Sequence, residues 1–221
     1  MMPKRVAVLV LIGIVAAGCS PESAAPPATL GPGAESSVAA VEQLHVYLVS
    51  GDFQEASALA IPKHAALASL AEGATFGQVA DALENGDTDV AANFWSGFAQ
   101  GVGESFVGEV LIEDAGTQSE DDETFHFVAV TPAGGVDQRF VTQDVSGHRV
   151  DLFASFGSAI AERMISPVEI LITSATPDAT LIIRELQLVV DSLTVAASDE
   201  NTSPEAVQSI LQLLELITRV G

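Results

Sequence analysis

From residue 38 to about residue 101, hydrophobic residues recur every three or four positions, the spacing of one face of an α-helix. Val41, Leu44 and Leu48 form the first such face, and Gly51 ends it. Further stretches each open on a capping residue or a proline, and the helices expected there span 52–60, 62–72, 75–85 and 87–101. The pattern therefore predicts a group of short helices in the N-terminal half of the chain.

After residue 104 the hydrophobic period falls to about two, which indicates β-strands. The candidates span 105–113, 123–131, 136–145 and 148–154, joined by short loops as an antiparallel meander. If Pro132–Gly135 and Ser146–Gly147 close two of the hairpins, Phe127 lies opposite Phe140, and Phe140 lies opposite Phe153. Because aromatic cross-strand pairs stabilise a sheet, we expect this row of phenylalanines to pack against the N-terminal helices.

In that register the opposite face of the sheet is also largely apolar, and it carries His126 and Arg139 close together. A sheet that is apolar on both faces needs cover on both, which the C-terminal third supplies unless this face lines a cavity. In a cavity, His126 is a candidate acid or base and Arg139 a candidate carboxylate ligand. The alternative is a paired, half-buried histidine and an arginine that extends to water. Trp95 is a third candidate for a pocket wall, with a role as a core anchor as its alternative.

The last third of the chain is again helical in pattern. Thr176 and Pro177 open one expected helix, which runs to about residue 197, and a capping box of Thr202 and Glu205 opens another, which runs to about residue 220. We expect the two to form an αα-hairpin packed on the sheet, with a hairpin that binds a partner as the alternative. The predicted fold class is therefore α+β: N-terminal helices packed on a curved four-stranded antiparallel meander, plus this hairpin.

The first residues have the pattern of an export signal. A positive start, Met1–Arg5, precedes an apolar stretch, Val6–Ala17, whose 12 residues would span about 18 Å as a helix. That length is well short of the roughly 30 Å hydrocarbon core of a bilayer, so the stretch is typical of a signal peptide rather than a membrane span. Ser20–Ser37 is rich in proline and small residues and is expected to be a disordered tether.

The end of that apolar stretch, Val15–Cys19, resembles the lipobox of bacterial lipoproteins, with small residues directly before a cysteine. The resemblance implies that Cys19 receives a diacylglyceryl group and becomes the N-terminus after cleavage; an ordinary secretory signal is the alternative. The expected organisation is a signal peptide (1–18), a lipidated cysteine with a linker (19–37), an α+β domain (38–156) and a helical extension (157–221). The protein would then lie on the extracytoplasmic side of a membrane, on the outer membrane if the cell has two.

Residues 38–156 resemble the NTF2-like (cystatin-like) group of exported bacterial lipoproteins. The similar features are helices followed by a curved meander that ends in Ser146–Leu152, and an opening helix followed by Gly51–Phe53. The resemblance implies a cone-shaped fold with a pocket between sheet and helices. It assigns no catalytic residue, because no active-site motif of the family can be matched here.

The net charge of the chain limits the kinds of molecule that it can bind. The chain has 8 basic and 30 acidic residues, a net charge of −22, and loss of Lys4 and Arg5 with the signal would leave −24. Such a surface repels phosphate backbones, which excludes nucleic acid, and it gains nothing from anionic lipid headgroups, so membrane attachment requires the lipid. The single cysteine excludes an internal disulfide.

We found no sequence motif for catalysis or for a metal or cofactor site. The chain has no H-E-x-x-H motif, no nucleophile elbow and no glycine-rich phosphate loop, and its four histidines lack ligand spacing. The acidic run Glu120–Glu123 is expected to be a solvated hairpin loop. The sequence thus favours a non-enzymatic module at the cell envelope that binds an apolar small ligand or an envelope protein. An isomerase- or cyclase-type enzyme and a structural protein acting through the C-terminal hairpin are the alternatives.

Overall fold

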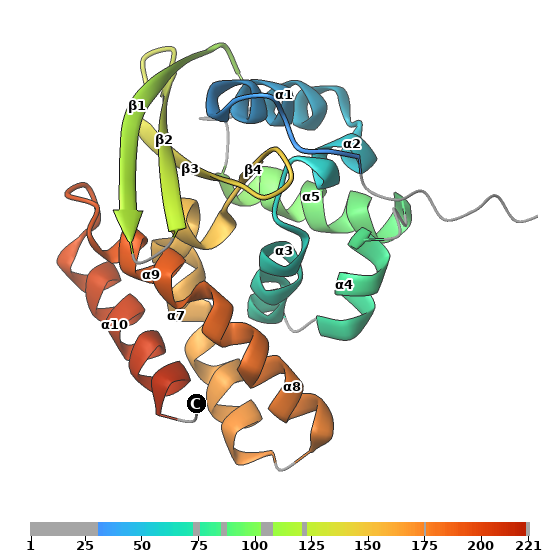
Figure 1. The fold of residues 1–221 in the computed structure, drawn as a ribbon, viewed down its shortest axis with the longest axis vertical. Coiled ribbons are helices and arrows are strands. Elements are labelled where there is room, and N and C mark those ends of the chain that lie inside the picture. Colours follow the sequence, from blue (N-terminus) through green and yellow to red (C-terminus); the bar gives the residue numbers. More distant parts are fainter. Residues whose placement is uncertain are drawn as a thin grey trace, which may run out of the picture.

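The structure, a computed structural model, describes residues 31–72, 76–84, 88–102, 108–120, 123–174 and 176–219. The fold is α+β, with helices and a four-stranded antiparallel sheet (Figure 1). The strands are β1 (Val110–Glu120), β2 (Glu123–Pro132), β3 (Gln138–Asp144) and β4 (His148–Val150). They are hydrogen-bonded in the order β1-β2-β3-β4, which confirms the predicted meander.

Along the sequence, helices both precede and follow the four strands. Before them come α1 (Ser37–Ser50), α2 (Phe53–Ala58), α3 (Pro62–Ala68), the 3₁₀ turn η1 (Ser69–Glu72), α4 (Phe76–Glu84) and α5 (Thr88–Val102). After them come α7 (Leu152–Thr173), α8 (Pro177–Leu186), η2 (Gln187–Val189), α9 (Val190–Ala197) and α10 (Pro204–Thr218). The predicted starts at Pro62, Pro177 and Pro204 are confirmed, as is the end of α1 at Gly51, which adopts the left-handed conformation with φ of 81°. The predicted capping box of Thr202 and Glu205 is wrong, because the hydroxyl of Ser203 accepts from Ala206 N and caps α10.

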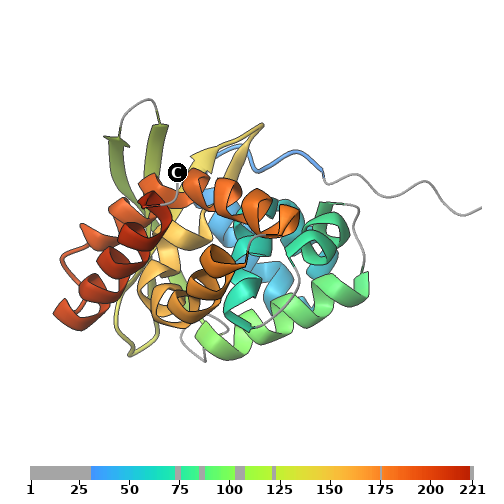
Figure 2. The same ribbon diagram turned by 90° about the horizontal axis from the view of Figure 1, so that it is seen from below.

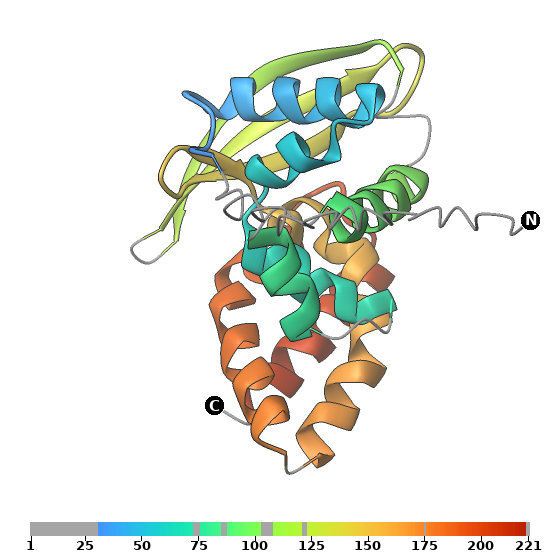
Figure 3. The same cartoon turned by 90° about the vertical axis from the view of Figure 1, so that its right-hand side faces the viewer.

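Both faces of the sheet are covered. On one face α1 contacts all four strands, and its Leu44 belongs to the main core with Val128, Phe140 and Val150. On the other face, Phe125, Phe127 and Val141 pack against Ala154 of α7 and Val195 of α9. Figure 3 shows the sheet with α1 and α2 at one end of the molecule and the C-terminal helices at the other. The C-terminal third therefore covers one face of the sheet, as predicted, but Val128 and Val150, which were expected on that face, pack with α1 instead.

The C-terminal helices form a group in which α7 is central. Both α9 and α10 pack along α7, and α10 also contacts α9. Figure 2 shows these orange and red helices beside the green and cyan helices, and α3 contacts both α7 and α8. The 22-residue α7 is not among the predicted helices. Among the residues that the structure describes, none of the helices is both long and apolar enough to cross a membrane.

The predicted strand register is wrong by one residue in two hairpins. Phe140 lies opposite Val128 rather than Phe127, and Thr142 lies opposite Val150. The last pair before the first loop is Val130 with Gln138, and the second turn has three residues, 145–147, rather than two. A slip of one residue moves every side chain to the other face, so the predicted row of phenylalanines does not form.

Two predicted strand boundaries are also wrong. The first strand spans 110–120 rather than 105–113, and the last ends at Val150, so Phe153 lies in α7. The backbone of β1 also contains a bulge between Asp114 and Gly116.

The predicted cap of α2 is present only in position. Asp52 precedes α2 as predicted, but its side chain makes no capping hydrogen bond and accepts a hydrogen bond from the Ser50 hydroxyl instead.

The last residues of the predicted linker pair with the edge strand β4. The Ala34 and His148 backbones exchange two hydrogen bonds of 2.9 and 2.8 Å, and Gly33 N donates to Ser146 O. A Cβ atom on Gly33 would lie 2.6 Å from the Gly147 carbonyl carbon, so this approach requires glycine. Residues 20–30 of the linker lie outside the described residues, as does Cys19.

Candidate functional site

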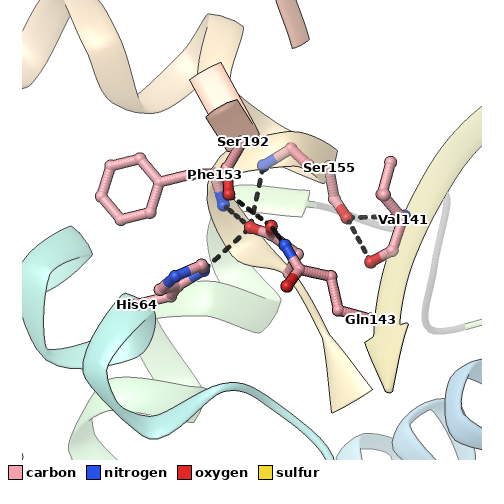
Figure 4. A network of polar contacts seen from close by, with 8 residues as sticks. His64, Val141, Gln143, Phe153, Ser155 and Ser192 are labelled. Carbon is pink, nitrogen blue, oxygen red and sulfur yellow. Dashed lines mark hydrogen bonds and ion pairs between the residues drawn. The ribbon is translucent and has the colours of Figure 1, made fainter. Parts of the chain in front are cut away.

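A buried carboxylate joins the sheet to the C-terminal helices. Asp151 follows β4 and is fully buried, and it caps the N-terminus of α7 because its Oδ1 accepts from Phe153 N at 2.9 Å and Ala154 N at 3.0 Å. Its Oδ2 accepts the hydroxyl of Ser192 at 2.6 Å and the side-chain amide of Gln143 at 2.8 Å. Figure 4 shows these contacts converging from β3, α7 and α9 on one side chain.

The fifth partner of this carboxylate is His64 of α3. Its Nδ1 lies 3.0 Å from Oδ1 of Asp151, and its ring meets the Phe153 ring edge-on with centroids 5.8 Å apart. Burial would raise the pKa of Asp151, but the charge and hydrogen bond of His64, with the bonds from Ser192 and Ala154, outweigh burial and lower that pKa. The carboxylate is therefore ionised at neutral pH, and it fixes the proton of His64 on Nδ1.

His64 lines a pocket of 340 Å³ between α3, the ends of β2 and β3, and the segment from α8 to α9. Its side chain is only 8% exposed, and its Nε2 makes no hydrogen bond with any described residue. The pocket wall also contains Gln143, Glu123, Asp191 and the ion pair of Lys63 with Glu185. Aliphatic residues complete it: Ile61, Leu67, Val145 and Leu188. The site thus combines a fixed imidazole with charged groups in a small cavity.

The charged groups around the pocket affect the pKa of Glu123. Burial raises the pKa of Glu123, and the negative charges of Asp191 and Asp151 raise it further, although His64 lowers it. Lys63 Nζ lies 2.8 Å from Glu185 Oε2, so the lysine charge on the wall is already neutralised. Burial and the neighbouring carboxylates together therefore favour the protonated form of Glu123.

The sequence pattern alone does not indicate this site. It predicts no role for His64, one of four histidines without ligand spacing, and it places Asp151 within the last predicted strand. A usable signal was present, because Asp151 stands directly before the apolar run that opens α7, as an N-cap residue does. Among the described residues no three His, Cys, Asp or Glu side chains are grouped closely enough to hold a metal ion.

The predicted pairing of His126 with Arg139 is wrong. His126 lies opposite Thr142 and contacts the His148 ring at 4.8 Å between centroids. Arg139 lies opposite Ala129, on the other face of the sheet. Its guanidinium lies 4.5 Å from the centre of the Phe127 ring and forms an ion pair with Asp199 at 3.0 Å. The slip in register explains the error, and neither residue lines the pocket.

Trp95 is a core anchor, which was the alternative to a role in a pocket wall. It is fully buried, and its ring makes edge contacts with Phe94 and Phe98 at 4.9 and 5.3 Å. Its indole nitrogen donates to Ser57 Oγ at 2.9 Å, which satisfies the polar atom within the core. The hydroxyl of Ser57 in turn donates to Phe53 O.

No protein-family model matches the chain, and neither the curated proteins nor the solved structures gave a match. A functional argument must therefore proceed from the geometry of the pocket and from the N-terminal sequence. The pocket offers two kinds of chemistry. One is recognition of a small polar molecule, and the other is proton transfer by a histidine held against a buried carboxylate.

Proposed function

We propose that this protein is an exported lipoprotein, anchored through lipid on Cys19, whose folded body is a non-enzymatic module that binds a small ligand. The ligand site is the pocket beside His64. The observation that carries this proposal is the Nε2 of His64, a nitrogen on a buried ring that lines a cavity and has no partner among the described residues. This nitrogen borders the cavity, so a ligand that forms a hydrogen bond with it gains both affinity and specificity.

The anchor is supported by the sequence alone. A positive start, a short apolar stretch and small residues before the single cysteine occur together, and an acidic body provides no electrostatic attraction to lipid. Two or more acyl chains are enough for stable anchoring. Intact mass spectrometry of the membrane fraction should give a mass for wild type that exceeds the cleaved polypeptide by the acyl groups. A Cys19→Ala variant should lack that increment, and equal modification in both chains would reject the anchor.

The pocket can be tested by nuclear magnetic resonance on the full-length chain in detergent micelles. Three classes of small probe would be titrated separately: n-butylammonium, butyrate and 1-butanol. We expect at least one class to cause saturable shifts of the Gln143 side-chain amide and the His64 ring, because both line the cavity. If none of the probes shifts these signals, the pocket is not a binding site and this part of the proposal fails.

A second candidate function is acid–base catalysis, which the pairing of His64 with Asp151 favours. A buried carboxylate that orients an imidazole is the arrangement that makes histidine an effective general base. Glu123, whose pKa is raised, would be the matching acid. The test is hydrolysis of p-nitrophenyl acetate by the wild type and by His64→Gln. Equal rates would reject catalysis, whereas a faster wild type with turnover would replace the binding proposal.

We also propose that residues 38–156 are a variant of the NTF2-like fold and that α8–α9 with α10 act as one αα-hairpin. The long α1 across a four-stranded antiparallel meander supports the first point, and the packing of α10 on α9 supports the second. Leu44 of α1 and Phe140 of β3 are fully buried and belong to one core cluster with the buried Trp95 of α5. In this variant the ligand site therefore lies outside the cone interior, between α3 and the segment from α8 to α9.

A further inference from the structure

We infer that the docked end of the N-terminal linker regulates the pocket beside His64. This segment, residues 31–34, is called the strap here, and it pairs with the edge strand β4 and the turn before it. Its docking holds part of the pocket wall in place, so that ligand binding and strap docking stabilise each other. The inference rests on the proposed binding function and adds how that site is regulated.

Arg149 of β4 connects the strap to two other segments of the backbone. The residue is only 7% exposed, and its guanidinium donates to three carbonyl oxygens. Nη2 donates to Gly31 O at 2.8 Å, Nε donates to Val145 O at 3.2 Å, and Nη1 donates to Ala58 O. Because a guanidinium presents its donors in a rigid plane, this side chain fixes the three segments relative to one another.

The other two segments both carry residues of the pocket wall. Val145 itself lines the cavity. Ala58 ends α2, and Ile61 lines the cavity directly before α3. The backbone of Val150 in β4 holds this connection as well, because its N–H donates to Leu59 O at 2.7 Å and its carbonyl accepts from Ile61 N at 3.1 Å. The strap, the turn after β3 and the start of α3 are therefore fastened together along β4.

Loss of the strap would loosen the turn that carries Val145. Gly33 N donates to Ser146 O at 3.0 Å, and the backbones of Gly33 and Gly147 approach so closely that neither has room for a Cβ atom. Ser146 adopts φ of 56°, a conformation that persists in a residue with a side chain when its surroundings hold it. A loosened wall must be ordered when a ligand binds, and this ordering lowers the affinity. Because coupling between two sites is reciprocal, a bound ligand should also keep the strap docked.

The test compares variants that displace the strap with one that does not, all in the full-length chain in micelles. Gly33→Ala places a Cβ atom 2.6 Å from the Gly147 carbonyl carbon, whereas Gly31→Ala is the matched control, because its added Cβ meets no atom within 4 Å. Ala34→Pro removes the amide that donates to His148 O at 2.9 Å, and so releases the strap without crowding the turn. Strap docking is measured by hydrogen exchange of the His148 amide, which donates to Ala34 O at 2.8 Å.

The affinity of the pocket is measured with whichever of n-butylammonium, butyrate and 1-butanol binds the wild type saturably. In Gly33→Ala and Ala34→Pro we expect faster exchange at His148 and an affinity lower by about fivefold or more, which is the low end of typical coupling between sites. Gly31→Ala should match the wild type in both measurements. In the wild type, a saturating concentration of the same probe should slow exchange at His148 by at least the factor that separates the two affinities.

The outcomes separate the two proposals. If both strap variants exchange faster at His148 and still bind the probe as tightly as the wild type, the coupling is overturned and the pocket remains a binding site. If exchange at His148 is unchanged in both variants, these contacts do not hold the strap, and the inference is overturned as well. If no probe binds the wild type, the binding proposal fails, and the inference that rests on it fails too.

Discussion

Replacing Asp151 with alanine should cost far more stability than removing an ordinary helix cap. The side chain is fully buried and accepts hydrogen bonds from five groups on α3, β3, α7 and α9. Alanine would leave His64 Nδ1 and the Ser192 hydroxyl as buried donors without partners. The two backbone amides at the start of α7 would lose their acceptor as well.

The magnitude follows from these losses. An N-cap contributes about 1 kcal/mol, and each buried donor left unpaired costs roughly 1–3 kcal/mol. Water entering from the pocket can pair with the Gln143 amide, so Gln143 adds little. The expected loss is about 3–5 kcal/mol of unfolding free energy, the range seen when one partner of a buried charged pair is removed. Asp151→Asn should cost less, about 1–2 kcal/mol, because its oxygen can keep the cap while Gln143 and Ser192 turn to accept from its amide.

Urea denaturation followed by circular dichroism at pH 7 would measure these differences. Ser203→Ala is the matched control, because the Ser203 hydroxyl caps α10 by accepting a single exposed hydrogen bond from Ala206 N. It should cost about 1 kcal/mol. If Asp151→Ala costs no more than Ser203→Ala, with unchanged denaturant dependence, the five contacts do not act as a stabilising network and the reasoning is refuted.

Three further predictions concern acid pH, the sheet edge and the core. The pKa of Asp151 is lower in the folded state than its unfolded value of about 4. Ionised Asp151 therefore stabilises the fold above that pH, and the stabilisation is lost as the pH falls toward the folded-state pKa. Acid titration of stability should therefore be shallower in Asp151→Asn than in wild type, and equal slopes would contradict this. Gly147→Ala forces a side chain onto a residue with φ of 97° and places Cβ 2.8 Å from the Gly33 backbone, so amide exchange at Ala34 should accelerate. Gly116→Ala, also left-handed but with open space around it, should leave that exchange unchanged. Trp95→Phe removes the hydrogen bond to Ser57 and part of a buried ring, and thermal unfolding should show a loss of about 1–3 kcal/mol.

The sequence predicted best those elements that have a proline or a glycine at one end. Pro62, Pro177 and Pro204 stand at the first position of their helices, and Gly51 provides the left-handed residue that ends α1. The strands were found but not their register, because the choice between a turn of two residues and one of three is not encoded in the alternation of the strands. Ser146 adopts φ of 56°, an uncommon conformation for this residue, and so gave no signal for the longer turn.

The site was missed for a related reason. His64 and Asp151 are 87 residues apart, and nothing local to either residue indicates the other. Residues 148–154 alternate in hydrophobicity, so Asp151 was assigned to the interior of a strand although it precedes an apolar run as N-cap residues do. That single choice removed α7 from the predicted fold. It also removed the carboxylate that α7 requires at its N-terminus, and with it the partner that makes His64 more than a scattered histidine. Because one aspartate ends the sheet, starts the helix and orients the imidazole, a boundary error of a few residues was enough to hide both the longest helix and the pocket.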